Sequence, residues 1–355
     1  MAKVLMKGNE AIGEAAIRAG CLNYFAYPIT PQSEVAEYLV RRMPEVNGVF
    51  LQGESEVAVG YMLFGAAGAG ERVFTTSSSP GVSLMSEAIS YIAGAQCPVV
   101  FVNIIRGGPG LGGILPSQGD YFQSVKGGGH GDYRMLVMAP ASVQEAVEMV
   151  MRAFPLAEKY RNPVMILGDG LIGQMMEPVE FPEHLRSEPS KKDDWATNGM
   201  DTRKSATRNL VKSLYLDPEA LNNHNLLLKS KYDRMKQEEV RYESYNADGD
   251  YQALIVSYGT MSRVCRTAID HLKEEGIEVG MIRPQTVFPF PEKAIQEAAS
   301  KENCRVVLSI EMSMGQMVED VERAVLGKRP VKWYGKCGGE VPTPEEIIEV
   351  VKEHL

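Results

Sequence analysis

Residues 49–76 read VFLQGESEVAVGYMLFGAAGAGERVFTT and contain one complete strand–helix–strand unit. Residues 49–52 and 72–76 have the apolar and aromatic composition of short strands. Between them, residues 55–69 are small and apolar and long enough for a helix. Two strands joined by a helix favour parallel pairing, because the helix covers one face of the sheet while the chain returns. The stretch therefore predicts a parallel α/β sheet.

The same alternation extends along the chain on both sides of this unit. A predicted α/β domain with a parallel sheet covers residues 1–184, and a smaller α/β domain covers residues 249–355. The segment between them, 185–248, is charged, polar and poorly periodic. We interpret that segment as a linker with a partial helix around 227–245 and a role in wrapping or partner contact.

Composition excludes several classes of protein. Of the 355 residues, 44% are hydrophobic and 23% are charged, as in ordinary globular proteins. The net charge of −9 argues against nucleic acid as a partner, because phosphate binding requires a cationic face. No stretch approaches the roughly 20 apolar residues of a membrane span. The first residues lack the apolar core of a secretory signal, so we expect a cytoplasmic location.

The five cysteines stand apart from one another in the sequence. No Cys-x-x-Cys pair is present, and iron–sulfur and zinc sites usually use cysteines grouped in such short motifs. We therefore expect this chain to hold neither kind of site alone, and assign no metal ligands to it. The cysteines are at positions 21, 97, 265, 304 and 337.

An acidic pair, Glu54 and Glu56, opens the uncharged stretch 57–70. A carboxylate at a helix start either caps the helix or serves chemistry in a poorly solvated site. Two further features favour chemistry: the turn Tyr-Pro-Ile-Thr-Pro at 27–31 and the hydroxyl-rich loop Thr-Thr-Ser-Ser-Ser-Pro-Gly at 75–81.

Two glycine motifs are interpreted as ordinary turns. Gly108, Gly110 and Gly113 match a dinucleotide-binding pattern, but residues 114–120 look like an irregular loop rather than a helix. Gly168-Asp169-Gly170 looks like the start of the motif that holds the magnesium diphosphate of thiamine diphosphate. The paired asparagine that completes such a motif is missing, so Asp169 is interpreted as a turn residue at a strand end.

His130 lies in a third glycine-rich loop. Its role is either structural or that of a lid or ligand contact.

The turn at 27–31, the Gly-Glu-Ser-Glu helix start, the loop at 76–81 and the strand ending at Arg106 together resemble one family. They are similar to the alpha-type subunit of the 2-oxoacid:ferredoxin oxidoreductases, most of all its 2-oxoisovalerate (branched-chain) branch. The N-terminal half resembles the pyrimidine-binding domain of thiamine diphosphate enzymes. The region from Tyr258 to Gln316 resembles a transketolase C-terminal-type domain.

The resemblance implies a role for each site residue. Glu56 matches the catalytic glutamate that hydrogen-bonds the aminopyrimidine ring of thiamine diphosphate, and Glu54 is the alternative. Thr30 matches a threonine that contacts the substrate's carboxylate or carbonyl oxygen. Arg106 matches the arginine that pairs with the 2-oxoacid carboxylate, which suits a guanidinium fork. The residues expected to touch the cofactor or a neighbouring subunit are Ser77, Ser78, Ser79 and Gly81.

The resemblance also implies an incomplete enzyme. Sister subunits would carry the Mg²⁺ diphosphate site and the [4Fe–4S] clusters, in agreement with the missing Asn-Asn and cysteine motifs. The complex would decarboxylate a 2-oxoacid oxidatively, reduce ferredoxin and pass the acyl group to coenzyme A.

Several alternatives stay open at this point. The substrate could be 2-oxoglutarate or pyruvate, although no obvious second cationic residue marks a pocket for a distal carboxylate. The chain could belong to a transketolase- or dehydrogenase-type thiamine enzyme. It could also be a non-catalytic binding or scaffold protein on a related fold.

Overall fold

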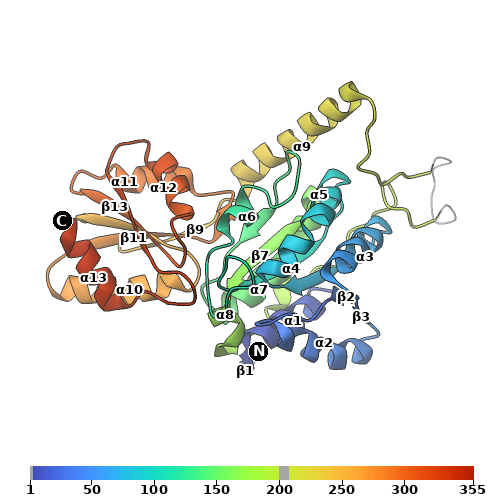
Figure 1. Ribbon diagram of the computed structural model, residues 1–355, viewed down its shortest axis with the longest axis horizontal. Helices are drawn as coiled ribbons and strands as arrows, with labels where there is room; N and C mark the ends of the chain where they lie inside the picture. The colour runs from blue at the N-terminus through green and yellow to red at the C-terminus, as the bar shows by residue number, and fades with distance from the viewer. Residues whose placement is uncertain (1–2, 200–207) are drawn as a thin grey trace.

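The computed structural model describes residues 3–199 and 208–355. Residues 200–207 of the predicted linker lie outside this part of the chain. Two α/β bodies lie side by side, with the C-terminal body at the left in Figure 1. This arrangement confirms the predicted α/β fold with a second, smaller domain.

The first body contains a seven-stranded sheet with the order β12-β6-β7-β5-β4-β2-β3. Every neighbouring pair is parallel except β12 with β6. The strands β3 and β4, which flank the helix predicted at 55–69, do not touch, because β2 lies between them. The bounds are β2 (Asn23–Ala26), β3 (Val49–Gln52), β4 (Phe74–Ser77), β5 (Val100–Ile105), β6 (Leu136–Met138), β7 (Val164–Asp169) and β12 (Thr286–Phe288).

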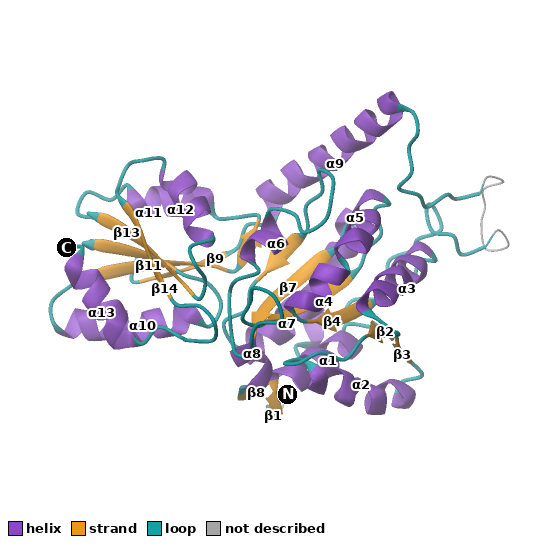
Figure 2. Cartoon of the chain, viewed as in Figure 1, coloured by secondary structure: helices purple, strands orange, loops and turns teal. Residues whose placement is uncertain are grey.

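Helices cover both faces of this sheet (Figure 2). Successive residues of a central strand point to opposite faces: Phe101 joins one apolar cluster, whereas Val100 and Val102 join the other. This explains the continuous apolar run of β5, because both of its faces are buried. The Phe101 cluster includes residues of α3 (Glu56–Gly68) and α5 (Ser86–Gly94), and the other cluster includes α1 (Gly8–Arg18), α2 (Ser33–Glu45) and α7 (Val143–Tyr160).

The second body is a five-stranded sheet with the order β14-β13-β10-β11-β9. Its central strands were predicted from the sequence, whereas its two edge strands were not. Strands are β9 (Tyr242–Tyr245), β10 (Ala253–Val256), β11 (Val279–Pro284), β13 (Val306–Glu311) and β14 (Val331–Gly335); helices are α10 (Met261–Glu274), α11 (Glu292–Ala299), α12 (Met317–Val325) and α13 (Pro344–Glu353).

The helix predicted around 227–245 is wrong in its bounds. Helix α9 spans Pro218–Glu238, and the Asp217 carboxylate caps its start by accepting a hydrogen bond from the Ala220 backbone at 2.8 Å. Residues 242–245 instead form β9, which pairs antiparallel with β11 of the second sheet. These residues form a strand rather than a helix because β11 provides hydrogen-bond partners for their backbone N–H and C=O groups. Local periodicity in the sequence does not encode this pairing. The division of the chain at 184 and 249 stays a prediction, and β9 and β12 cross it.

Several short elements have no counterpart in the sequence-based prediction, because they are too short to show a full period. They include β1 (Val4–Lys7), which pairs with β8 (Met176–Val179), and α4 (Ser79–Leu84) just before α5. The others are α6 (Tyr121–Val125), α8 (Gly170–Gln174), the 3-10 turn Glu183–Leu185, β12 and β14.

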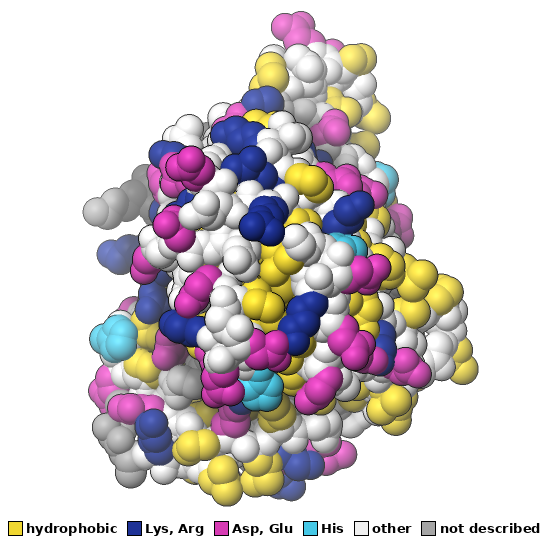
Figure 3. Space-filling view, turned by 90° about the vertical axis from the view of Figure 1, so that its left-hand side faces the viewer, with side chains coloured by type: hydrophobic (Ala, Val, Ile, Leu, Met, Phe, Trp, Pro, Cys, Tyr) yellow, Lys and Arg dark blue, Asp and Glu magenta, His cyan; other side chains and the backbone are white. Residues whose placement is uncertain are grey.

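The distribution of charged side chains on the surface agrees with the net negative charge of the sequence. Acidic and basic side chains alternate over the face of the second domain shown in Figure 3, rather than forming a cationic field. In residues 3–199 and 208–355, no helix is both long and apolar enough to cross a membrane.

Candidate functional site

The predicted site residues follow the carboxyl ends of neighbouring parallel strands. Thr30 follows β2, Glu56 follows β3, Ser77 ends β4 and Arg106 follows β5. The carboxyl ends of parallel strands share one edge of a sheet, where ligands of open α/β sheets bind. The topology thus gathers residues that are far apart in the sequence.

Glu56 is the first residue of α3, and its side chain is buried at 7% exposure. Ser55 already caps the helix, since its hydroxyl accepts a hydrogen bond from the Ala58 backbone at 3.2 Å. Capping therefore does not explain the Glu56 carboxylate. Glu54, two residues earlier, is exposed.

Gly81 and Ser77 lie against Glu56. A Cβ atom added to Gly81 would lie 2.8 Å from Glu56 Oε1 and 2.2 Å from Ser77 Oγ. Any other residue at position 81 would therefore displace one of these two side chains. This contact brings together three of the residues that the sequence associated with the cofactor.

Two hydroxyl groups at the end of β4 are unsatisfied. Ser77 Oγ and Ser78 Oγ are buried and form no hydrogen bond within the described chain. Buried hydroxyls normally have a partner, so two such groups in succession next to a buried carboxylate fit the binding of a polar ligand. On this observation, the residues present fit the pyrimidine end of thiamine diphosphate.

Arg106 connects two other loops of the site. Its Nη1 donates to the Thr30 carbonyl at 2.9 Å and its Nη2 donates to the Leu111 carbonyl at 3.3 Å. The side chain is 8% exposed, and Nε is buried without a hydrogen-bond partner. No described carboxylate forms an ion pair with it. A buried guanidinium without an anion is uncommon, and it fits recognition of an anionic ligand.

Thr30 is placed by the turn that contains it. Asn9 Nδ2 and Gln174 Nε2 both donate to the Pro31 carbonyl, at 2.8 and 3.1 Å. These contacts attach the turn to α1 and α8. The Thr30 side chain is exposed and its carbonyl faces Arg106.

Sequence reasoning missed two polar residues of the site. Asn103, fully buried in β5, accepts a hydrogen bond on Oδ1 from the Ser79 backbone at 3.1 Å. Its Nδ2 donates to Asp120 Oδ2 at 2.9 Å. Burial raises the pKa of the Asp120 carboxyl, and hydrogen bonds from Ser79 and Asn103 act in the opposite direction. The sequence signal that could have identified Asn103 is its position as a polar residue inside the otherwise apolar run PVVFVNII.

Asp169 caps a helix and contacts the second domain. Its Oδ1 accepts hydrogen bonds from the Leu171 and Ile172 backbone at 2.9 and 3.2 Å, and its Oδ2 accepts one from the Thr260 hydroxyl. Burial raises the pKa of this carboxyl. The placement agrees with the interpretation of Asp169 as a turn residue at a strand end.

The glycine-rich segments around Gly110 and His130, in contrast, form loops. After Gly113 the chain forms no helix until α6, so the dinucleotide pattern lacks the helix that it requires. His130 is exposed; its carbonyl accepts a hydrogen bond from Ser90 Oγ at 2.7 Å, and its ring lies edge-on to Tyr91.

Comparison with protein families gives two matches along the chain. Residues 14–244 match the family described as pyruvate flavodoxin/ferredoxin oxidoreductase, thiamine diphosphate-binding. Residues 252–347 match the pyruvate:ferredoxin oxidoreductase core domain II.

Among curated relatives, the ketoisovalerate oxidoreductase subunit VorB of Methanothermobacter thermautotrophicus is 48% identical over 99% of this chain and 98% of its own length. The 2-oxoglutarate synthase subunit KorA of Archaeoglobus fulgidus is 37% identical over 99% of both chains.

Solved structures give two further similarities. The 2-oxoglutarate:ferredoxin oxidoreductase from Magnetococcus marinus superimposes with a TM-score of 0.86 at 26% identity over 99% of this chain. This chain spans 65% of that longer chain. A split-gene transketolase, with a TM-score of 0.58 and 14% identity, shares the fold.

Proposed function

The chain belongs to the pyruvate flavodoxin/ferredoxin oxidoreductase family and is a subunit of a thiamine diphosphate-dependent 2-oxoacid oxidoreductase, for which we propose a substrate and the roles of individual residues. The complex that it joins decarboxylates 2-oxoisovalerate oxidatively, transferring the acyl group to coenzyme A and the electrons to ferredoxin. The observation that carries the proposal is the convergence of Glu56, Ser77 and Gly81 next to the Arg106–Thr30 pair at one sheet edge.

Glu56 is the proposed catalytic residue. Thiamine diphosphate, when bound, would supply a carbon nucleophile for the 2-oxo carbon. The buried Glu56 carboxylate would hydrogen-bond a pyrimidine ring nitrogen and hold a proton there, and the apolar surroundings of α3 keep water away from this bond. Ser77 and Ser78 offer unsatisfied hydroxyl groups to the cofactor or the adjoining subunit. Ser79 and Gly81 belong to the first turn of α4, so the hydroxyl-rich stretch predicted as a loop is the end of β4 and the start of this helix.

Arg106 and Thr30 are the proposed substrate-binding residues. The Arg106 guanidinium has N–H donors left for the 2-oxoacid carboxylate, because within the described chain Nη1 and Nη2 each donate to one backbone carbonyl and Nε has no partner. Residues 107–117 contain no charged side chain, and Leu111, Ile114 and Leu115 are exposed there. An apolar loop beside the arginine favours an uncharged branched substrate over 2-oxoglutarate, whose distal carboxylate would require a second cation.

The assembled complex tests this function. We expect coenzyme A-dependent reduction of ferredoxin or viologen, with a higher kcat/KM for 2-oxoisovalerate than for pyruvate or 2-oxoglutarate. A preference for 2-oxoglutarate would contradict the proposed substrate alone. Reduction of lipoamide or NAD without ferredoxin would instead favour a dehydrogenase-type enzyme.

We propose that sister subunits hold the Mg²⁺ diphosphate site and the [4Fe–4S] clusters. Within residues 3–199 and 208–355, no group of three His, Cys, Asp or Glu side chains is placed to hold a metal ion. The carboxylate of Asp169 is engaged by α8 and Thr260, which supports the assignment of the diphosphate to another subunit.

The isolated chain is therefore expected to bind magnesium thiamine diphosphate only weakly, because half a site lacks the charge-assisted contacts to the diphosphate. Titration calorimetry on the purified chain measures this affinity. Metal analysis of the same anaerobic preparation should find no stoichiometric iron. Submicromolar, magnesium-dependent binding would show that Gly168-Asp169-Gly170 is a diphosphate site after all.

A further inference from the structure

Residues 118–126, which follow the loop 107–117 after Arg106, are held by hydrogen bonds to the second domain. The two ends of this loop lie close together, since the Gly107 backbone donates a hydrogen bond to the Leu115 carbonyl at 3.1 Å. Gln118, 1% exposed, then inserts between the carboxyl ends of β10 and β13. Its Nε2 donates to the Tyr258 carbonyl and its Oε1 accepts from the Met312 backbone, both at 2.9 Å. Both ends of the Gln118 amide are thus held by the second domain.

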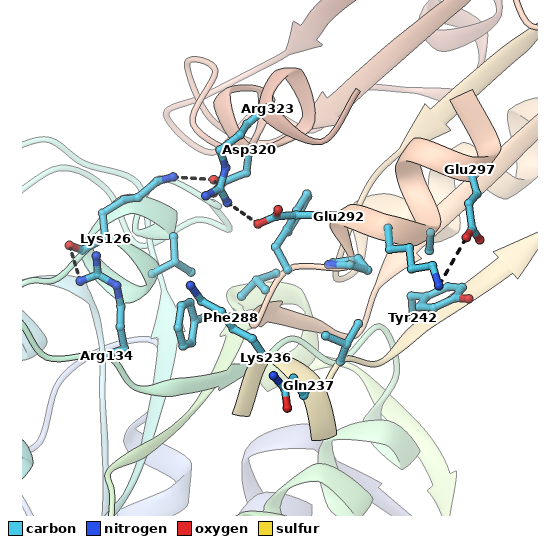
Figure 4. Close-up of a pocket in the computed structure, with 17 residues that line it drawn as sticks. Lys126, Arg134, Lys236, Gln237, Tyr242, Phe288, Glu292, Glu297, Asp320 and Arg323 are labelled. Carbon is cyan, nitrogen blue, oxygen red and sulfur yellow. Dashed lines mark hydrogen bonds and ion pairs between the residues drawn. The ribbon is translucent and has the colours of Figure 1, made fainter. Parts of the chain in front are cut away.

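Two residues at the start of α12 hold the same segment further along. Gln316 Nε2 donates to the Gly119 carbonyl at 2.6 Å, and Gln316 Oε1 accepts from the Phe122 backbone at 2.8 Å. Asp320 accepts hydrogen bonds from Tyr121 OH at 2.7 Å and from Lys126 Nζ at 2.5 Å. Figure 4 shows the Lys126–Asp320 contact at one side of a cleft of about 600 Å³. Residues 118–126 are therefore positioned by the second domain.

Asp120 lies within this anchored segment but faces the candidate site. Its carboxylate accepts a hydrogen bond from Asn103 Nδ2 at 2.9 Å, and the same amide accepts one from the Ser79 backbone at 3.1 Å. Ser79 Oγ in turn accepts a hydrogen bond from the Arg106 backbone at 3.1 Å. The chain of contacts runs from α12 through Asp120 to the start of α4 and to Arg106.

We propose that Asp120 is a positioning residue, through which the second domain sets the placement of Ser79 and Arg106 in the candidate site. Asn103 can donate to Asp120 and accept from Ser79 at the same time only in one orientation of its amide, so the carboxylate selects that orientation. The second domain thereby contributes to substrate binding without touching the substrate. This inference rests on the proposed role of Arg106.

The test uses the assembled complex with the substitutions Asp120→Ala, Asp120→Asn and Gln316→Ala. In Asp120→Ala we expect the Ser79 and Arg106 backbone amides to exchange hydrogen about tenfold faster. We expect kcat/KM for the 2-oxoacid to fall by about 10–100-fold, mostly through KM, because Arg106 is displaced. Asp120→Asn keeps an acceptor for Asn103 and should restore part of both losses.

Gln316→Ala removes two hydrogen bonds between the second domain and the segment, to Gly119 and Phe122, and substitutes no residue of the first domain. Faster exchange at Ser79 and Arg106 in this variant distinguishes coupling between the domains from a purely local role of Asp120. Asp132→Asn, an exposed aspartate in the nearby glycine-rich loop, is the matched control and should leave both readouts unchanged.

Wild-type exchange rates and wild-type KM in both Asp120→Ala and Gln316→Ala would overturn the proposal. If Asp120→Ala does not assemble, Gln316→Ala and Asp120→Asn decide the result. Hydrogen exchange requires no turnover, so a complex that is inactive on every 2-oxoacid would refute the proposed function and still report on this coupling.

Discussion

Replacing Glu56 by glutamine is expected to lower kcat of the assembled complex by about 10²–10⁴-fold, the range of general acid–base contributions. Glutamine has nearly the same shape, so the close contact with Gly81 and the start of α3 should persist. An amide cannot share a proton with a pyrimidine nitrogen as a carboxylate does. Steady-state ferredoxin reduction with 2-oxoacid and coenzyme A measures the loss, while circular dichroism and gel filtration check fold and assembly.

Glu54→Gln is the matched control for this prediction. Glu54 is exposed two residues earlier, so its substitution should leave turnover close to that of the wild type. Near-normal activity of Glu56→Gln together with an inactive Glu54→Gln would move the catalytic assignment to Glu54.

Replacing Arg106 by alanine is expected to cost about 2–5 kcal/mol in kcat/KM for the 2-oxoacid, because it removes one partner of a desolvated ion pair. That range corresponds to roughly 30-fold to several thousand-fold. Affinity for thiamine diphosphate should change little, since Arg106 contacts the Thr30 and Leu111 carbonyls rather than the Glu56 pocket. Steady-state kinetics combined with a cofactor titration separate the two effects.

Thr30→Val and Arg134→Ala complete this experiment. Thr30→Val retains the carbonyl that orients Arg106 and removes only the hydroxyl, so a smaller loss in the same parameter is expected. Arg134 also donates to backbone carbonyls, at 2.9 and 3.4 Å, and serves as the matched arginine control. An unchanged kcat/KM in Arg106→Ala and Thr30→Val would remove both residues from the substrate site.

The candidate site was partly accessible from the sequence. Glu56 and Arg106 stand out because each is a charged residue beside a long apolar run, and such local contrast is visible without a structure. The choice between Glu54 and Glu56 is not visible in this way. It depends on burial, and the buried position of Glu56 favours Glu56 over Glu54 as the catalytic carboxylate. Asp120 lay in a stretch interpreted as irregular loop, so its contact with Asn103 could not be foreseen.

The sequence by itself determined the α/β class and the approximate bounds of the strands from β2 to β7, because buried strands and amphipathic helices leave local patterns of composition and period. Tertiary structure alone decided that β9 joins the second sheet and that β12 pairs with β6 of the first. It also decided that Gln118 bonds to Tyr258 and Met312. These contacts join residues far apart in the chain, and their stability comes from satisfying buried polar groups across that distance. A local pattern carries no record of which distant partner satisfies them.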